Sequence, residues 1–175
     1  HVAYETSGNI AVLDDYIYQQ MDIAAAFTHL VGGDTQTMDA AFEKVKQIIA
    51  DRKPEDDEPE ELLPFKGALR RAEARGADRY LGIPEDHVHF LNLPFYETGS
   101  VKKKPLSQAD IDIIVKLLRE VQPHQIYAAG DLADPHGTHG VCLDAILKAY
   151  DIVCEDEWFK NCYTWWYRGA WMEWE

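Results

Sequence analysis

Two histidines three residues apart, His136 and His139, are the residues of this chain whose types and spacing most directly suggest chemistry. They follow Asp134-Pro135 and lie between the apolar run 126–129 and a helical pattern that continues from Val141. In open α/β folds, ligands bind at the carboxyl ends of the strands, where loops carry groups that the core excludes. Imidazole is the commonest metal ligand and the usual acid or base near neutral pH. The loop is therefore a candidate metal site, a candidate proton-transfer site, or both.

The same loop also has an ordinary structural interpretation. Asp-Pro and His-Gly are common turn sequences, and Thr138 is of a residue type that caps helices. Two histidines alone do not form a zinc site, because structural zinc needs four protein ligands and catalytic zinc normally three plus water. The spacing leaves the structural and the chemical interpretations open.

Two further groups are candidates for ligand binding. Arg70 and Glu73 lie three residues apart in a helical pattern, either as a surface ion pair or as a guanidinium held ready for an anionic or hydroxyl-rich substrate. The stretch Thr6-Ser7-Gly8-Asn9 follows the first strand and offers backbone donors and the Asn9 amide, although a plain turn is the simpler explanation. The phosphate-binding glycine motifs and the Gly-x-Ser-x-Gly nucleophile motif are absent from the sequence.

Alternating strands and helices must position these groups. Short apolar runs predict strands at residues 2–5, 88–93, 126–129 and 163–167. Helical periodicity predicts helices at residues 10–31, 35–49, 65–80, 108–118 and 141–150. This alternation predicts an α/β fold with βαβ units and a mostly parallel sheet. The acidic, proline-containing stretch at about 53–62 is expected to be a surface loop.

Composition narrows the class of protein. A length of 175 residues with 46% hydrophobic residues predicts one globular domain over residues 1–175. The net charge of −14 argues against nucleic acid and anionic membranes as partners, and we find no apolar run of membrane-spanning length. Three scattered cysteines do not make a disulfide framework, which favours a cytoplasmic location.

Several blocks of the sequence together resemble the LmbE/PIG-L family of zinc-dependent N-deacetylases. These blocks are the strand ending in Thr-Ser-Gly-Asn, the helix with Arg-x-x-Glu, and the strand–Asp-Pro-His-x-x-His–helix unit. Residues 1–9, 90–99, 124–142 and 167–175 are most similar to the LmbE-like domain fused to glucosamine-6-phosphate deaminase in some bacterial proteins. The resemblance implies a Rossmann-like three-layer fold and removal of an acetyl group from an N-acetylglucosamine-type amino sugar.

The resemblance also implies roles for individual residues. His139 matches a zinc ligand, and His136 matches the histidine that stabilises the oxyanion or protonates the leaving amine. Asp134 matches a residue that supports catalysis, whereas Arg70 and Asn9 match substrate-binding positions. Bound zinc lowers the pKa of its water and polarises the amide carbonyl.

The chain departs from the family pattern in one essential respect. The family's His-Pro-Asp-Asp motif, which supplies two zinc ligands and the general base, occurs nowhere in the 175 residues, and the resemblance places it upstream. We therefore expect the fold to lack its first strand and helix and this chain alone to be inactive. The exposed sheet edge would then favour self-association or contact with a fused deaminase domain.

A non-catalytic module remains as an alternative. In that interpretation His136 and His139 are structural, and the chain binds a sugar phosphate or a partner domain. The aromatic end of the chain would form the interface. Its members are Trp165, Trp166, Tyr167, Trp171 and Trp174.

Overall fold

A computed structural model describes residues 1–53, 55–130, 134–167 and 169, so Trp171 and Trp174 lie outside the described residues. The chain divides into two compact units. The helical unit takes residues 7–82 and 99–101, and the strand unit takes residues 1–6, 83–98 and 102–175. The single domain expected over residues 1–175 stays a prediction.

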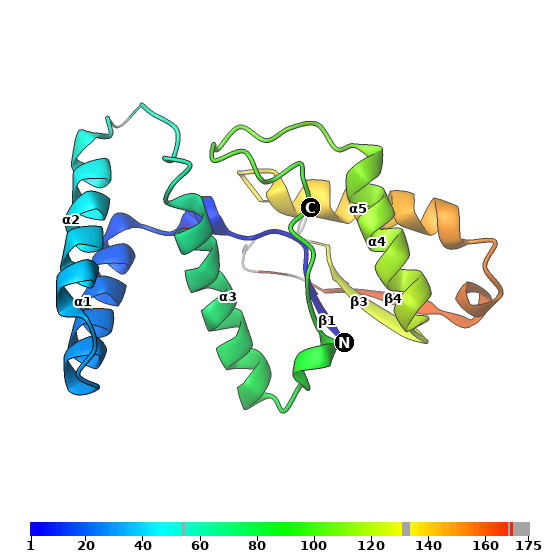
Figure 1. Cartoon of the computed structure of the whole chain (residues 1–175). Coiled ribbons are helices and arrows are strands. Elements are labelled where there is room, and N and C mark those ends of the chain that lie inside the picture. Colours follow the sequence, from blue (N-terminus) through cyan, green and yellow to red (C-terminus); the bar gives the residue numbers. More distant parts are fainter. Residues whose placement is uncertain (54, 131–133, 168, 170–175) are drawn as a thin grey trace. The chain divides into compact units, whose positions relative to one another are not determined.

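The helical unit contains an antiparallel hairpin of two helices, α1 (Asp14–Leu30) and α2 (Thr35–Asp51), which lie side by side in Figure 1. Ile17 and Met21 of α1 are buried together with Leu62. The apolar face of α2 packs against them through Phe42, Val45, Ile48 and Ile49. Asp34 caps α2, because its side chain accepts hydrogen bonds from the backbone N–H groups of Gln36 (3.0 Å) and Thr37 (3.1 Å).

The prediction of one continuous helix over residues 10–31 was wrong at its start. A short 3-10 helix, η1 (Asn9–Ala11), comes first, and Val12 and Leu13 are extended before α1 begins at Asp14. Val12 is 6% exposed, and burial of its apolar side chain stabilises the extended conformation that interrupts the helix. Asp14 and Asp15 then occupy the first turn of α1, where carboxylates favour a helix start.

The third helix, α3 (Leu63–Tyr80), packs against η1 and carries a fully buried lysine. The Lys66 ammonium donates to Glu58 (2.6 Å) and to Asp14 (3.2 Å), and Arg52 also pairs with both carboxylates. These bonds connect the start of α1, the end of α2, and α3 to Glu58. Glu58 belongs to the acidic stretch at about 53–62, which is therefore a surface loop fixed at this residue.

In the strand unit, β1 (Val2–Tyr4) pairs in parallel with β2 (Val88–Phe90), and β3 (Gln125–Ala129) pairs in parallel with β4 (Tyr163–Tyr167). The strand expected over 88–93 ends at Phe90, because Asn92 adopts a left-handed conformation (φ 48°). Two short 3-10 helices, η2 (Glu85–His87) and η3 (Glu157–Asn161), precede β2 and β4.

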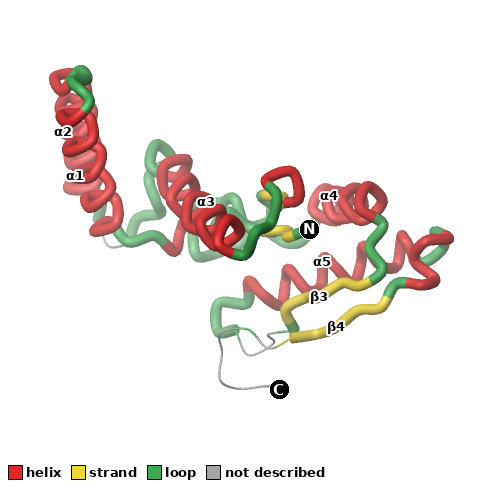
Figure 2. The backbone as a smooth tube through the Cα atoms, turned by 90° about the horizontal axis from the view of Figure 1, so that it is seen from below, coloured by secondary structure: helices red, strands yellow, loops and turns green. Residues whose placement is uncertain are grey.

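Two helices complete the strand unit. These are α4 (Gln108–Val121) and α5 (Thr138–Val153), which pack on each other, and α5 lies along β3 (Figure 2). A capping box of Ser107 and Asp110 starts α4, where Asp110 accepts from the Ser107 backbone N–H at 2.9 Å.

The protein is thus a mixed α/β structure with short parallel strands, as expected. Across the described residues, the strands form two separate pairs instead of one sheet. The Rossmann-like three-layer arrangement therefore stays a prediction. Within the described parts of the chain, no helix is both long and apolar enough to cross a membrane.

Candidate functional site

Asp134 organises the loop that carries the two histidines. Its side chain is 4% exposed, and its carboxylate accepts the backbone N–H of His136 and that of His139, each at 2.9 Å. The second bond satisfies an amide in the first turn of α5, which begins at Thr138. Thr138, considered as a possible cap, gives no side-chain cap to α5, and Asp134 accepts the His139 backbone N–H instead.

Both imidazoles lie around this one carboxylate. The Nδ1 atom of His136 is 3.3 Å from one Asp134 oxygen, and the Nδ1 atom of His139 is 4.0 Å from the other. Burial raises the pKa of Asp134, but the N–H groups of His139 and His136 outweigh it, so the pKa lies below its ordinary value. The carboxylate therefore stays ionised and places a negative charge beside both rings. The two rings are 64% and 42% exposed, which leaves them accessible to a ligand.

A buried carboxyl in the strand unit was missed by the sequence reasoning. Glu5 follows β1, and burial raises its pKa to about 7 against the lowering effect of its hydrogen bond to Cys142. Burial also raises the pKa of the Cys142 thiol, and Glu5 raises it further. The only signal in the sequence was a carboxylate directly after a strand. A three-residue strand does not reveal which of its neighbours becomes buried.

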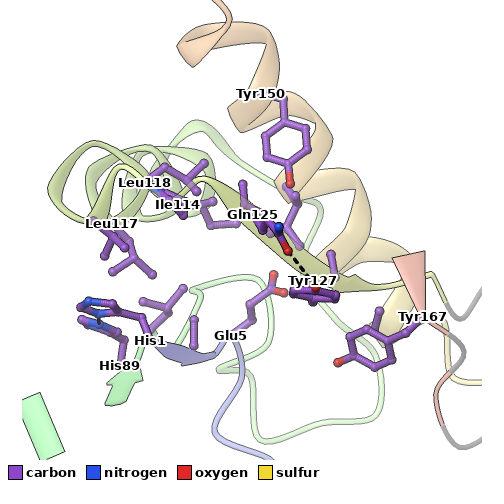
Figure 3. A pocket seen from close by; sticks show the side chains of 18 residues that line it. His1, Glu5, His89, Ile114, Leu117, Leu118, Gln125, Tyr127, Tyr150 and Tyr167 are labelled. Carbon is purple, nitrogen blue, oxygen red and sulfur yellow. Dashed lines mark hydrogen bonds between the residues drawn. The ribbon is translucent and has the colours of Figure 1, made fainter. Parts of the chain in front are cut away.

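A pocket of about 290 Å³ lies between β1 and β3 (Figure 3). Ala3 and Glu5 line it from the first strand segment, all five residues of β3 line it from the other side, and α4 contributes apolar side chains. Figure 3 shows Glu5 pointing toward β3, where Tyr127 donates a hydrogen bond to Gln125 at 2.8 Å. In the described chain, β1 and β3 each pair with one strand only, so each has an open edge.

The other two predicted site residues, Asn9 and Arg70, belong to the helical unit. Asn9 is 3% exposed in η1, which packs on α3, and Arg70 of α3 forms an ion pair with Glu73. The Arg70 side chain lies over Gly8, where an added Cβ would come within 3.3 Å of its Nε atom. Gly8 also has a φ of 64°, which favours glycine. A side chain at position 8 would therefore crowd Arg70.

The described residues do not by themselves form a zinc site. No group of three or more His, Cys, Asp or Glu side chains among them is placed to hold a metal ion. His136 and His139 bring imidazoles to one place, and Asp134 is an orienting carboxylate of the kind that accompanies ligating histidines. Imidazole suits zinc, but a catalytic zinc site would need further ligands.

A parallel strand, a loop with two imidazoles around a carboxylate, and a following helix give a mixed α/β protein with a candidate ligand site after a strand. The family model for PIG-L, GlcNAc-PI de-N-acetylase, matches residues 28–150, and the chain belongs to this family. The matched region includes Arg70 and the loop with His136 and His139.

One curated relative covers the whole chain. It is a glucosamine-6-phosphate deaminase-like protein of Bacteroides thetaiotaomicron, 48% identical over 178 residues. The alignment covers 100% of this chain and 27% of the relative, so the chain spans about a quarter of that protein's length. No solved structure matches the chain.

Proposed function

We propose that this chain is part of a zinc-dependent hydrolase that removes the acetyl group from an N-acetylglucosamine-type amino sugar. The observation that carries this proposal is the loop in which the His136 and His139 rings surround the Asp134 carboxylate, in a chain of the PIG-L family. The family description names a de-N-acetylase of a GlcNAc-bearing compound, which supports an amino sugar as the substrate.

Each residue of the loop has a role in this proposal. His139 serves as a zinc ligand, and bound zinc supplies a water of lowered pKa and a Lewis acid for the amide carbonyl. His136, which faces the ionised Asp134, acts in its imidazolium form: it donates a hydrogen bond to the oxyanion and then a proton to the leaving amine. In the helical unit, Arg70 and Asn9 bind the substrate.

The remaining zinc ligands are proposed to come from an upstream segment that carries the family's His-Pro-Asp-Asp motif. The open edges of β1 and β3 on either side of the Glu5 pocket support this idea, because a parallel strand between them would satisfy both edges. Such a strand would join the two strand pairs into one sheet and give the Rossmann-like three-layer fold. Without it, the chain alone is expected to be inactive.

We further propose that the domain works in the cytoplasm within a larger protein related to glucosamine-6-phosphate deaminase. The coverage of 27% of the curated relative supports a larger protein, and the free cysteines Cys142, Cys154 and Cys162 fit a reducing compartment.

A second candidate function is a non-catalytic interaction module. The exposed aromatic side chains Trp165, Trp166 and Tyr167 on β4 favour it, because such residues are enriched in protein interfaces. In this case the histidine loop would be structural, and the protein would neither retain zinc nor release acetate.

The deciding experiment measures zinc content and acetate release from N-acetylglucosamine with the full-length protein. His139→Ala is expected to remove zinc and activity together, whereas His136→Ala keeps zinc and lowers kcat about 10²–10⁴-fold. His29→Ala, at an exposed histidine of α1, is the matched control and leaves both unchanged. A wild-type protein without zinc and without acetate release would overturn the proposal in favour of the interaction module.

A further inference from the structure

A second pocket lies within the helical unit, between α1 and α3. Its volume is about 190 Å³, smaller than the roughly 300–1,000 Å³ of drug-sized ligand sites, so it suits a single ring. Tyr16 and Gln20 line it from α1, one helical turn apart and therefore on the same face. Arg70 and Glu73 line it from α3. The rest of the wall is apolar and consists of Ala11, Val12, Leu69 and Ala72.

The polar groups of this pocket are held in place by the fold. The Arg70 side chain packs closely over Gly8, where an added Cβ would lie 3.3 Å from Nε and 3.4 Å from Cγ. Glu73 pairs with one guanidinium nitrogen, Nη1, and a guanidinium carries five N–H donors in all. The ion pair of Arg70 and Glu73 therefore offers N–H donors and a carboxylate acceptor to a ligand in the pocket.

The charges of the pocket discriminate between ligand classes. Arg70 and Glu73 cancel, and the other six lining residues carry no charge. A phosphate group of about −1.5 to −2 would meet the Glu73 carboxylate in a chain whose net charge is −14. An uncharged ring meets no such repulsion. Its hydroxyl groups match Arg70, Glu73 and the Gln20 amide, which both donates and accepts.

The aromatic side chain completes the match to a sugar. Tyr16 is 48% exposed, so part of its side chain is accessible to a ligand in the pocket that it lines. An aromatic ring can cover the apolar C–H face of a sugar while its hydroxyl group keeps a polar contact.

We infer that the α1–α3 pocket binds the unphosphorylated ring of an amino sugar, with Tyr16 and Gln20 as specificity-determining residues beside Arg70. This inference rests on the proposed function for the kind of sugar. It adds that the sugar carries no phosphate at this pocket and that α1 contributes to its recognition.

The test measures the dissociation constants of N-acetylglucosamine and its 6-phosphate by calorimetry on the full-length protein after removal of metal by chelation. The neutral sugar is expected to bind about tenfold more tightly or better. Tyr16→Ala is expected to weaken its binding about tenfold, and Tyr16→Phe is expected to retain most of it. The matched control is Phe27→Ala, at another exposed aromatic residue of α1 that lies outside the pocket, and this variant should bind as the wild type does.

A variant that removes the negative charge of the pocket makes the test sharper. Glu73→Gln leaves Arg70 uncompensated, so the binding of the phosphorylated sugar should improve about tenfold relative to the neutral one. Equal or tighter binding of the phosphorylated sugar by the wild type, or no effect of Tyr16→Ala, would overturn the inference. Because metal-free protein is used, this outcome is independent of zinc binding and acetate release, on which the proposed function is judged.

Discussion

At the scale of the residue, Asp134 connects the structure of the loop to its chemistry. One carboxylate holds two backbone amides at 2.9 Å and also faces two imidazole rings. Hydrogen bonds from these backbone amides keep the carboxylate ionised, so a negative charge faces both rings. Asp134 is thus a positioning residue in the proposed reaction, because it acts through His136.

Asp134→Asn tests this positioning role. The amide retains an acceptor for one backbone N–H but carries no charge, so His136 loses the carboxylate that faces its ring. The kcat for acetate release should therefore fall about 10–100-fold while the KM stays near that of the wild type. Asp144→Asn, at an exposed carboxylate of α5 paired with Lys148, is the control and should leave both constants unchanged. An unchanged kcat in Asp134→Asn would show that the carboxylate only caps the helix.

Glu5 makes the stability of the chain depend on pH. Its pKa rises from 4.5 to about 7 on folding, so the folded state holds a proton that the unfolded state releases between these values. The contribution of this proton to the free energy of unfolding is fully present below the unfolded pKa and is lost as the pH rises through about 7.

Glu5→Gln should remove this pH dependence, because glutamine is neutral at every pH. Relative to the wild type, the variant should gain about 2–3 kcal/mol in free energy of unfolding between about pH 5 and about pH 8. Urea denaturation at the two pH values measures this gain, with the exposed Glu120→Gln of α4 as the control. An identical gain in the two variants would show that burial of Glu5 is not the cause.

Residue patterns predicted which side chains meet only where the residues are close in sequence. The Asp34 cap, the capping box of Ser107 and Asp110, and the pair of Arg70 and Glu73 all follow from spacing, and the structure contains them. The burial of Glu5 beside Cys142 joins residues 137 positions apart (142 − 5), and no local pattern encodes it.

At the scale of the element, α4 depends on one acid for its attachment as well as for its start. Asp110 is fully buried and accepts from the Ser107 backbone N–H at 2.9 Å and from the Phe95 backbone N–H at 2.8 Å. The first bond closes the capping box, and the second ties the helix to the loop that follows β2.

Asp110→Ala should therefore destabilise the protein more than the loss of an ordinary cap. Two backbone donors, one of them in a buried loop, lose their acceptor, and each unsatisfied group costs about 1–3 kcal/mol. We expect a loss of about 2–4 kcal/mol in urea denaturation. Asp112→Ala on the same helix, where the exposed carboxylate bonds only Gln108 among the bonds described, should cost about 0.5 kcal/mol or less. Equal losses in the two variants would contradict the role of Asp110.

The elements themselves were predictable because their signals are local. Strand β4 was predicted with its observed bounds, and α2 and α3 begin within two residues of their predicted starts. The failure at residues 10–13 has a tertiary cause, since burial of Val12 beside α3 outweighs the helical periodicity there.

At the scale of the whole molecule, strand pairing was the least predictable feature. Parallel pairing follows from the alternation of strands and helices, but which strands are neighbours depends on contacts such as that of β1 with β2, over 80 residues away. The sequence predicted one sheet, and the described chain has two pairs with open edges beside one pocket. An added strand between them, as proposed, would reconcile the two descriptions.

The charge of the whole molecule leads to a last prediction. With 31 acidic against 17 basic residues, the chain has a net charge of −14, and like charges repel most in the compact state. Raising NaCl from about 0.1 M to about 1 M shortens the screening length from about 10 Å to about 3 Å. Salt also weakens surface ion pairs such as Lys46–Glu43, but these contribute little. The melting temperature at neutral pH should therefore rise with salt.

The control for this prediction is the same measurement near the isoelectric point of 4.8. There the net repulsion vanishes, so the same addition of salt should have a smaller effect. A rise of equal size at both pH values would mean that salt acts through apolar surface and not through charge.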